Sequence, residues 1–320
     1  MNDLSTKHTT IINNLTDPRD PTLALGTKFQ QLISALGGAG TPVNAVKALM
    51  TLGVSGVSLD GETVTIGTRK YEFCADTALS KTLPTNIAVD ISVHSAHGAR
   101  VLTIDTQPTS NDTFTIGTKV YTIVPAGTAN ADGEVSRATD LATAKLAIVA
   151  AINGTDGHNN PHPSVTAAAF VVNDCTITAI IGGTAGNAIA TTETFTATNN
   201  VFAGATLTGG ANCSAANTQA DLVAAINADT PVQVVASNGS AQDVLLTAKV
   251  AGAAANDIPL AETMAQGAFS GAAVKMAGGV NGTVGVVGKP LVDATYVYFC
   301  VADNTVAGQN WRRVSLGSVY

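Results

Sequence analysis

The chain repeats parts of its own sequence, and this repetition restricts the folds open to it more than any other feature. Residues 63–73 (TVTIGTRKYEF) match residues 113–123 (TFTIGTKVYTI), with Thr, Ile, Gly, Thr and Tyr in register. Residues 221–227 (DLVAAIN) match the end of residues 141–153 (LATAKLAIVAAIN). Repeats of this kind indicate one structural unit that has been duplicated, rather than a single large fold.

The copies differ in how much of the unit they keep. One copy is complete, an earlier copy keeps mainly the hairpin, and a later copy keeps the helix and a closing segment in which 256–264 (NDIPLAETM) echoes 187–195 (NAIATTETF). A chain of 320 residues is long enough for two or three domains. We therefore expect five segments: an N-terminal arm and helix (1–52), a partial first β module (53–110), a complete α+β module (111–211), a truncated α+β repeat (212–281) and a C-terminal aromatic β segment (282–320).

Alternation of polar and apolar residues predicts that most of the chain forms strands. Asp60 and Gly61 separate two alternating segments, which is typical of a β-hairpin. In 63–66 (TVTI) the threonines face one side and the apolar residues the other, as in a sheet with one solvated face. Residues 141–153 instead follow helical spacing, and Asp140 is placed to cap them. The expected fold is α+β and mostly β, built of tandem small modules of antiparallel strands with one helix each.

A polar arm and a short helix are expected to precede the strands. Residues 1–20 are polar and hold no apolar stretch of the kind found in a signal peptide. Residues 22–36 have helical spacing and end at Gly37 and Gly38. One helix of this length is marginal alone, so it either packs on its own domain or docks on a neighbouring subunit. We expect a helical or extended anchor here, and no membrane-spanning helix, because no run of about 20 apolar residues occurs.

Composition argues against several classes of partner and site. The net charge of −7 disfavours binding to nucleic acid or to an anionic membrane through a basic face. Aromatic residues make up 4% of the chain, so a deep pocket lined with aromatics is not expected. We expect no cofactor.

The cysteines are expected to be free. Cys74, Cys175, Cys213 and Cys300 are widely spaced and form no C-x-x-C pair. In a protein made in the cytosol this pattern predicts buried thiols, with a disulfide or a metal site as the alternative.

Two loops could carry chemistry, and each has a plainer interpretation. Residues 182–188 (GGTAGNA) could cradle a phosphate, but the Lys-Ser/Thr of a P-loop is missing, which favours a tight turn that closes the repeat. Asp156, His158 and His162 could gather a metal, but Pro161 interrupts them and a solvated loop is preferred.

Two further groups are weaker candidates. His94 and His97 with Cys74 could contribute to a metal site. Glu193 and Glu262 match between copies and, as paired carboxylates, would suggest glycosidase chemistry. Duplication alone explains that match, which favours a capping or surface role for the two glutamates.

The last candidate lies near the C-terminus. Trp311 with Arg312 and Arg313 could bind a carbohydrate or a carboxylate of a partner. The preferred alternative is that Trp311 and the strand of Tyr296 and Tyr298 form the core of the terminal domain. A nucleophile elbow of the G-x-S-x-G kind is absent from the sequence. We therefore expect no catalytic, cofactor-binding or metal residues, and no enzyme.

Several motifs resemble structural proteins of tailed bacteriophages. They are Thr-x-Thr-Ile-Gly-Thr-x-x-Tyr, the helix end IVAAING and the segment GTAGNAIATTET. The C-terminal residues 294–305 (ATYVYFCVADNT) and 310–314 (NWRRV) look like the end of phage head fibre proteins. The resemblance covers about residues 60–320 and implies a non-enzymatic, oligomeric role on a particle, with a trimer favoured if the protein is fibre-like.

The expected function is therefore structural. The resemblance implies a head fibre or capsid decoration protein of a bacteriophage virion, anchored by its N-terminal region. A tail fibre or tail adaptor is the alternative, and a protein that binds or degrades host glycans is a third possibility from another class. The expected partners are the major capsid protein or another virion protein, further copies of the chain and a host-surface glycan.

Overall fold

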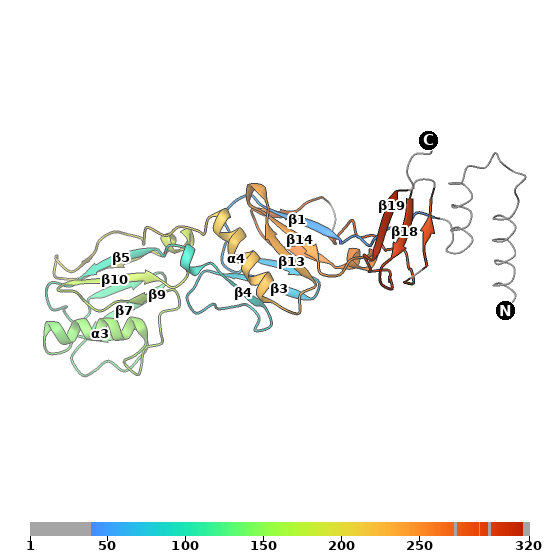
Figure 1. The fold of residues 1–320 in the computed structure, drawn as a ribbon. Helices are drawn as coiled ribbons and strands as arrows, with labels where there is room; N and C mark the ends of the chain where they lie inside the picture. The colour runs from blue at the N-terminus through green and yellow to red at the C-terminus, as the bar shows by residue number, and fades with distance from the viewer. Residues whose placement is uncertain (1–39, 272–273, 288, 294–295, 316–320) are drawn as a thin grey trace, which may run out of the picture.

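The fold is mostly β, as expected. The structure is a computed structural model that describes residues 40–271, 274–287, 289–293 and 296–315. Within these residues the strands form five small sheets, and two α-helices accompany them (Figure 1). None of the helices described is long and apolar enough to cross a membrane. The expected polar arm (1–20) and the expected helix (22–36) lie outside the described residues.

One unit, here the proximal unit, is assembled from two separated parts of the chain, about residues 45–94 and 212–280. Its sheets have the orders β13-β14-β1-β16 and β15-β2-β3-β4, and α4 packs against them in a single core. Its elements are β1 (Leu49–Val54), β2 (Thr63–Ile66), β3 (Arg69–Cys74), β4 (Ile87–Asp90), η1 (Ser92–His94), α4 (Ala215–Ala228), β13 (Val234–Asn238), η3 (Ser240–Gln242), β14 (Asp243–Ala248), η4 (Ala253–Asp257), β15 (Leu260–Glu262) and β16 (Gly267–Phe269).

The second unit, here the distal unit, is formed by residues 96–211 and has its own core. Its sheet orders, β9-β10-β5-β12 and β11-β6-β7-β8, repeat those of the proximal unit strand for strand. Its elements are β5 (Ala99–Thr103), β6 (Thr113–Ile116), β7 (Lys119–Val124), β8 (Glu134–Ser136), α3 (Leu141–Asn153), β9 (Val165–Ala167), β10 (Asp174–Ala179), η2 (Thr184–Ala188), β11 (Thr191–Glu193) and β12 (Val201–Phe202).

The two units are nested rather than arranged in tandem. The distal unit is inserted between β4 and α4 of the proximal unit, at the point where the distal unit itself has only the short connection 137–140 between β8 and α3. The expected partial module (53–110) and truncated repeat (212–281) thus contribute to the same sheets: Leu260 pairs with Ile66, and Gly53 with Asp243. The segment expected to be an N-terminal arm also contributes, since β1 begins at Leu49. Local sequence matches reveal which stretches are alike but not which strands pair.

The repeated sequence motifs make the same contacts in both units. Asn153 ends α3 and exchanges two hydrogen bonds with the backbone of Ala167 (2.8 and 2.9 Å), and Asn227 does the same with Ala236 near the end of α4 (both 2.9 Å). These amides satisfy backbone groups where a helix meets a strand. The Asn of the repeated Ala-Ala-Ile-Asn motif therefore fixes each helix on its sheet.

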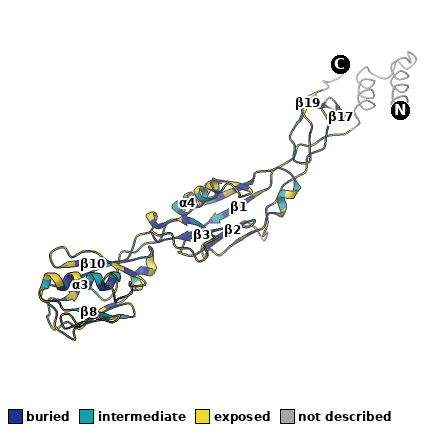
Figure 2. Ribbon diagram, turned by 90° about the horizontal axis from the view of Figure 1, so that it is seen from below, coloured by how far each residue is buried: buried dark blue, intermediate teal, exposed yellow. Residues whose placement is uncertain are grey.

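The described part of the molecule is elongated. Figures 1 and 2 show three bodies in a row: the distal unit, the proximal unit and a three-stranded sheet of β17 (Leu291–Val292), β18 (Tyr296–Cys300) and β19 (Trp311–Ser315). The beginning of the described chain lies beside this sheet. Thr41 Oγ1 donates to Asp293 (2.9 Å), and Asn44 bonds the backbone of Trp311.

Both joints between the bodies are built in the same way. At the joint to the distal unit, Ala96 and Ala211 exchange backbone hydrogen bonds (2.8 and 3.1 Å), as Val46 and Val280 do at the other joint (2.9 and 3.2 Å). Near each pair an asparagine side chain makes two bonds with a glycine backbone: Asn187 with Gly210, and Asn256 with Gly279. Each joint is therefore a short two-stranded connection, which is harder to bend than a single linker.

Because the units are nested and have separate cores, each unit should fold without the other. We expect residues 96–211, produced on their own, to unfold cooperatively. We also expect a chain in which an Asn-Gly turn replaces residues 96–211 to keep a folded proximal unit, because the two chain ends at the joint are neighbours. Circular dichroism and thermal unfolding measure this. The matched control is residues 111–211, which follow the sequence-based boundary. They lack β5, the strand between β12 and β10, and should be unfolded; a cooperative transition for 111–211 would contradict the assignment.

Two equivalent tyrosines offer a test of how much a buried hydroxyl contributes. Tyr71 and Tyr121 are both fully buried. Tyr71 Oη donates to Asp229 (2.9 Å), whose carboxylate also accepts two bonds from Arg69 (2.7 and 2.8 Å). The hydroxyl of Tyr121 has no hydrogen-bond partner among the described residues.

We expect Tyr71→Phe to lower the free energy of unfolding of the proximal unit by about 2 kcal/mol, since a hydrogen bond to a carboxylate is lost. Tyr121→Phe should leave the distal unit equally stable or more stable, because the change removes an unsatisfied buried group. Urea unfolding of the two variants decides this. Equal losses would show that the hydroxyl of Tyr121 is satisfied in solution.

Candidate functional site

An apolar groove lies on the distal unit, along α3. It has a volume of about 770 Å³, and its walls are α3 and the turn between β9 and β10. Leu146 and Val172, which line the groove, are 69% and 84% exposed. The residues that line the groove are Leu141, Ala142, Lys145, Leu146, Val149, Ala150, Thr155, Ala169, Phe170 and Val172. Exposed apolar surface of this kind is typical of binding surfaces.

The proximal unit shows that the fold does not require this groove. Aligning the two helices on Asn153 and Asn227 places Leu146 opposite Ala220, and the turn 168–172 (AAFVV) opposite 237–241 (SNGSA). The same backbone therefore carries large apolar side chains in the distal unit and small or polar ones in the proximal unit. The apolar run 170–172 at a turn is the sequence signal for this groove, and it lies outside the stretches that the two units share.

The groove offers few polar or charged groups that could bind a polar ligand or take part in a reaction. Its one charged side chain, Lys145, is mostly buried and its Nζ is 2.8 Å from both Val172 O and Asn173 Oδ1. The ammonium also lies 5.6 Å from the centre of the Phe170 ring. Because its bonds hold the turn against α3, Lys145 is a structural residue, and the groove offers mainly apolar contact.

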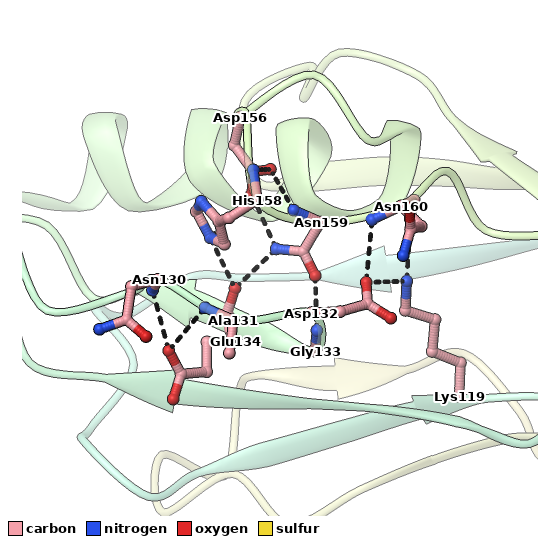
Figure 3. A network of polar contacts seen from close by, with 10 residues as sticks. All are labelled: Lys119, Asn130, Ala131, Asp132, Gly133, Glu134, Asp156, His158, Asn159 and Asn160. Atoms are coloured by element: carbon pink, nitrogen blue, oxygen red, sulfur yellow. Dashed lines mark hydrogen bonds and ion pairs between the residues drawn. The ribbon is translucent and has the colours of Figure 1, made fainter.

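Asp156 and His158 are part of a loop network rather than a metal site (Figure 3). The Asp156 carboxylate accepts bonds from the backbone and side chain of Asn159 (2.9 and 2.8 Å), and Asn159 in turn bonds Glu134 O and Gly133 N. His158 Nε2 lies 3.3 Å from Asp156 Oδ2 and from Glu134 O. Burial opposes ionisation of Asp156, but the bonds from Asn159 and His158 outweigh it and lower the pKa of this carboxyl. The contacts fix the loop after α3 onto the first residue of β8 and the residue before it.

His162 lies apart from these two residues. Its Nε2 is 3.0 Å from Ile116 O, and its Nδ1 accepts from the backbone of Ser164 (3.1 Å) and Val165 (3.2 Å). The ring is therefore neutral, with the proton on Nε2, and burial lowers its pKa. The three residues weighed as possible metal ligands therefore do not come together.

The glycine loop 182–188 closes the joint to the distal unit. It begins with Gly183 in a conformation that favours glycine (φ 114°) and contains η2. Its backbone is occupied within the chain: Gly183 N donates to Ala96 O (2.8 Å) and Thr184 N to Asn212 Oδ1 (2.8 Å). These contacts fit the expected repeat closure and leave no cradle of free N–H groups for a phosphate.

The matched glutamates lie in different units. Glu193 ends β11 and Glu262 ends β15, so they occupy equivalent places in different units. Glu262 Oε2 accepts a bond from Met264 N (2.7 Å), which is a local turn contact.

The C-terminal aromatics form a small core, and this prediction is confirmed. Trp311 is buried with Tyr298 and Cys300, with Tyr296 packed against them, and its Nε1 donates to Thr283 O (2.8 Å). The guanidinium of Arg313 lies 4.4 Å from the centre of the Tyr296 ring.

The cysteines are free and buried, as expected. Burial raises the pKa of Cys74 to about 11 and that of Cys175 to about 12, so neither thiol is activated as a nucleophile. His97 bonds Ala179 O (2.8 Å), away from Cys74. His94 instead meets Asp221 and Cys213, two residues more than 100 positions away in the chain that no local motif groups with it.

The depressed pKa of His162 predicts a pH dependence of stability. Between the lowered native pKa and the ordinary value of 6.5, the unfolded chain binds the proton and the native chain does not. The contribution of His162 to the free energy of unfolding should therefore be constant above about pH 6.5 and fall as the pH decreases below it. Urea unfolding of the distal unit at pH 7.5 and 5.0 should show this fall, and His162→Gln should reduce the difference. Aspartates with lowered pKa values, such as Asp132, act only at lower pH. An unchanged difference in His162→Gln would contradict the prediction.

In comparisons with known proteins, the chain matches no family model, no curated protein and no solved structure.

Proposed function

We propose that the chain is a non-enzymatic structural protein of a bacteriophage particle, a head fibre or capsid decoration protein that is anchored through its N-terminal region and projects its units outward. The observation that carries the proposal is the order of the parts along the long axis of the molecule. The described chain enters beside the β17–β19 sheet at one end of an elongated molecule, and the distal unit lies at the opposite end (Figures 1 and 2). An anchor before residue 40 would then hold that end and present the distal unit farthest from the particle.

The joints support a projecting role. Each joint is crossed by two chain segments that are hydrogen-bonded to each other, and an asparagine fixes the neighbouring glycine backbone. A single flexible linker would allow the units to fold back on the particle surface, whereas a paired connection resists this. Repetition of the same joint extends the molecule along one axis.

The end with the β17–β19 sheet also carries apolar surface suited to a protein partner. Phe299 lies on β18, Val301 lies two residues later, just beyond the end of that strand, and Val314 lies on the neighbouring strand β19. These three side chains are 45%, 55% and 60% exposed. Apolar side chains grouped on one sheet face are typical of an interaction surface. We propose that this face contacts the major capsid protein or another virion protein, or further copies of the chain in a trimer.

A deletion tests the anchor. We expect particles assembled without the natural protein to bind the full chain, but not a chain that lacks residues 1–39, which leaves β1 and both units intact. The matched control removes the opposite end: a chain with residues 96–211 replaced by Asn-Gly should still bind. Co-sedimentation with particles measures binding, and immunogold labelling shows whether the protein sits on heads or on tails. Normal binding of the 1–39 deletion would refute the proposed anchor, and labelling of tails would favour a tail fibre or adaptor.

A further inference from the structure

Three side chains that can bind metals meet at the joint between the proximal and distal units. His94 is the last residue of η1, Cys213 lies before α4, and Asp221 lies on α4. One ligand atom from each lies within 4.8 Å of the other two, and His94 Nδ1 is 2.9 Å from Asp221 Oδ2. Within the described ranges, this is the one group of three His, Cys, Asp or Glu side chains so arranged.

We propose that His94, Cys213 and Asp221 form a binding site for a divalent transition metal, with Zn²⁺ as the ion of best fit, and that the ion fastens to α4 the two chain segments that lead into and out of the distal unit. A thiolate, an imidazole and a carboxylate are together the donors that Zn²⁺ takes in proteins. Tetrahedral binding at ordinary bond lengths would place the three donor atoms about 3.4–3.6 Å apart. Small side-chain movements reach that spacing from the present one.

Charge and exposure suit such an ion. When Zn²⁺ binds, Cys213 releases its thiol proton to solvent, so one thiolate, one carboxylate and a neutral imidazole balance the two positive charges. Cys213 is fully buried, while the side chains of His94 and Asp221 are 37% and 17% exposed. The ion would thus have an entry path and a fourth position for water on the side of His94.

The surrounding contacts hold the donors in place. Thr218 Oγ1 lies 3.6 Å from Cys213 Sγ, where it can donate to the sulfur, a contact of the kind that orients metal ligands. The turn that carries His94 is fixed by Asp90, whose Oδ1 accepts from the backbone and hydroxyl of Ser92 (3.0 and 2.7 Å).

The duplicated unit provides an internal comparison. In the distal unit, the positions of Cys213 and Asp221 are held by Thr139 and Ala147, and a short connection replaces the segment with His94. The donors therefore occur only where a second unit is inserted: His94 lies just before the inserted segment and Cys213 just after it. This location assigns the site to the joint rather than to the fold that both units share.

Metal titration of the full chain tests the site. After removal of metal by a chelator, we expect one equivalent of Co²⁺ to give a thiolate-to-cobalt charge-transfer band, and Zn²⁺ to displace the Co²⁺. Both His94→Gln and Cys213→Ser should abolish the band, and His94→Gln should weaken Zn²⁺ binding at least about 100-fold. His97→Gln, three residues away, is the matched control and should bind normally.

Thermal unfolding distinguishes loss of the metal site from loss of the fold. Zn²⁺ should raise the midpoint of thermal unfolding of the full chain and of His97→Gln, but not of His94→Gln, whose exposed side chain can change without disturbing the core. No charge-transfer band in the full chain, or equal Zn²⁺ binding by His94→Gln, would overturn the proposal. The measurements are made without particles, so their outcome is independent of the proposed anchoring role.

Discussion

Antiparallel pairing between β1 and β14 closes the proximal unit around everything inserted in it. Leu52 pairs with Val244, both are fully buried, and β1 also pairs with β16 on its other side. These partners are distant in sequence, so the core cannot form until the chain between them is arranged. The distal unit reduces that difficulty, because it folds from contiguous residues and brings Ala96 and Ala211 together. A long loop then becomes a short one.

The same connection appears twice along the axis, and this gives the molecule its form. In each unit the first and last segments run side by side at one end, as Val46 and Val280 do in the proximal unit. A unit with adjacent ends can be inserted into a loop of another unit without disturbing either core. The connection between β4 and α4 is such a loop, and its direction away from the β17–β19 sheet makes the nested units extend rather than cluster (Figure 1).

The contacts that both units share are those that the common fold needs, and the features found in one unit only are not. Both units keep a threonine pair beside the hairpin, Thr63 with Thr263 and Thr113 with Thr194. The apolar groove at Leu146 and the donor cluster at Cys213 each occur in one unit only. Because an identical strand order forms without them, these features do not serve the folding of the unit. They are the places where the two copies have acquired separate properties.

The sequence by itself determined the local structure: the hairpins, the helix of 141–153 with its Asp140 cap, the aromatic core around Trp311 and the existence of a repeat. These depend on periodicity and on residues close in the chain. Only the tertiary structure decided that residues 53–110 and 212–281 complete one another, that His94 meets Cys213 and Asp221, and that the turn beside Leu146 forms a groove. Strand pairing across the inserted unit sets these contacts, and no local pattern encodes which distant strand a given strand will join.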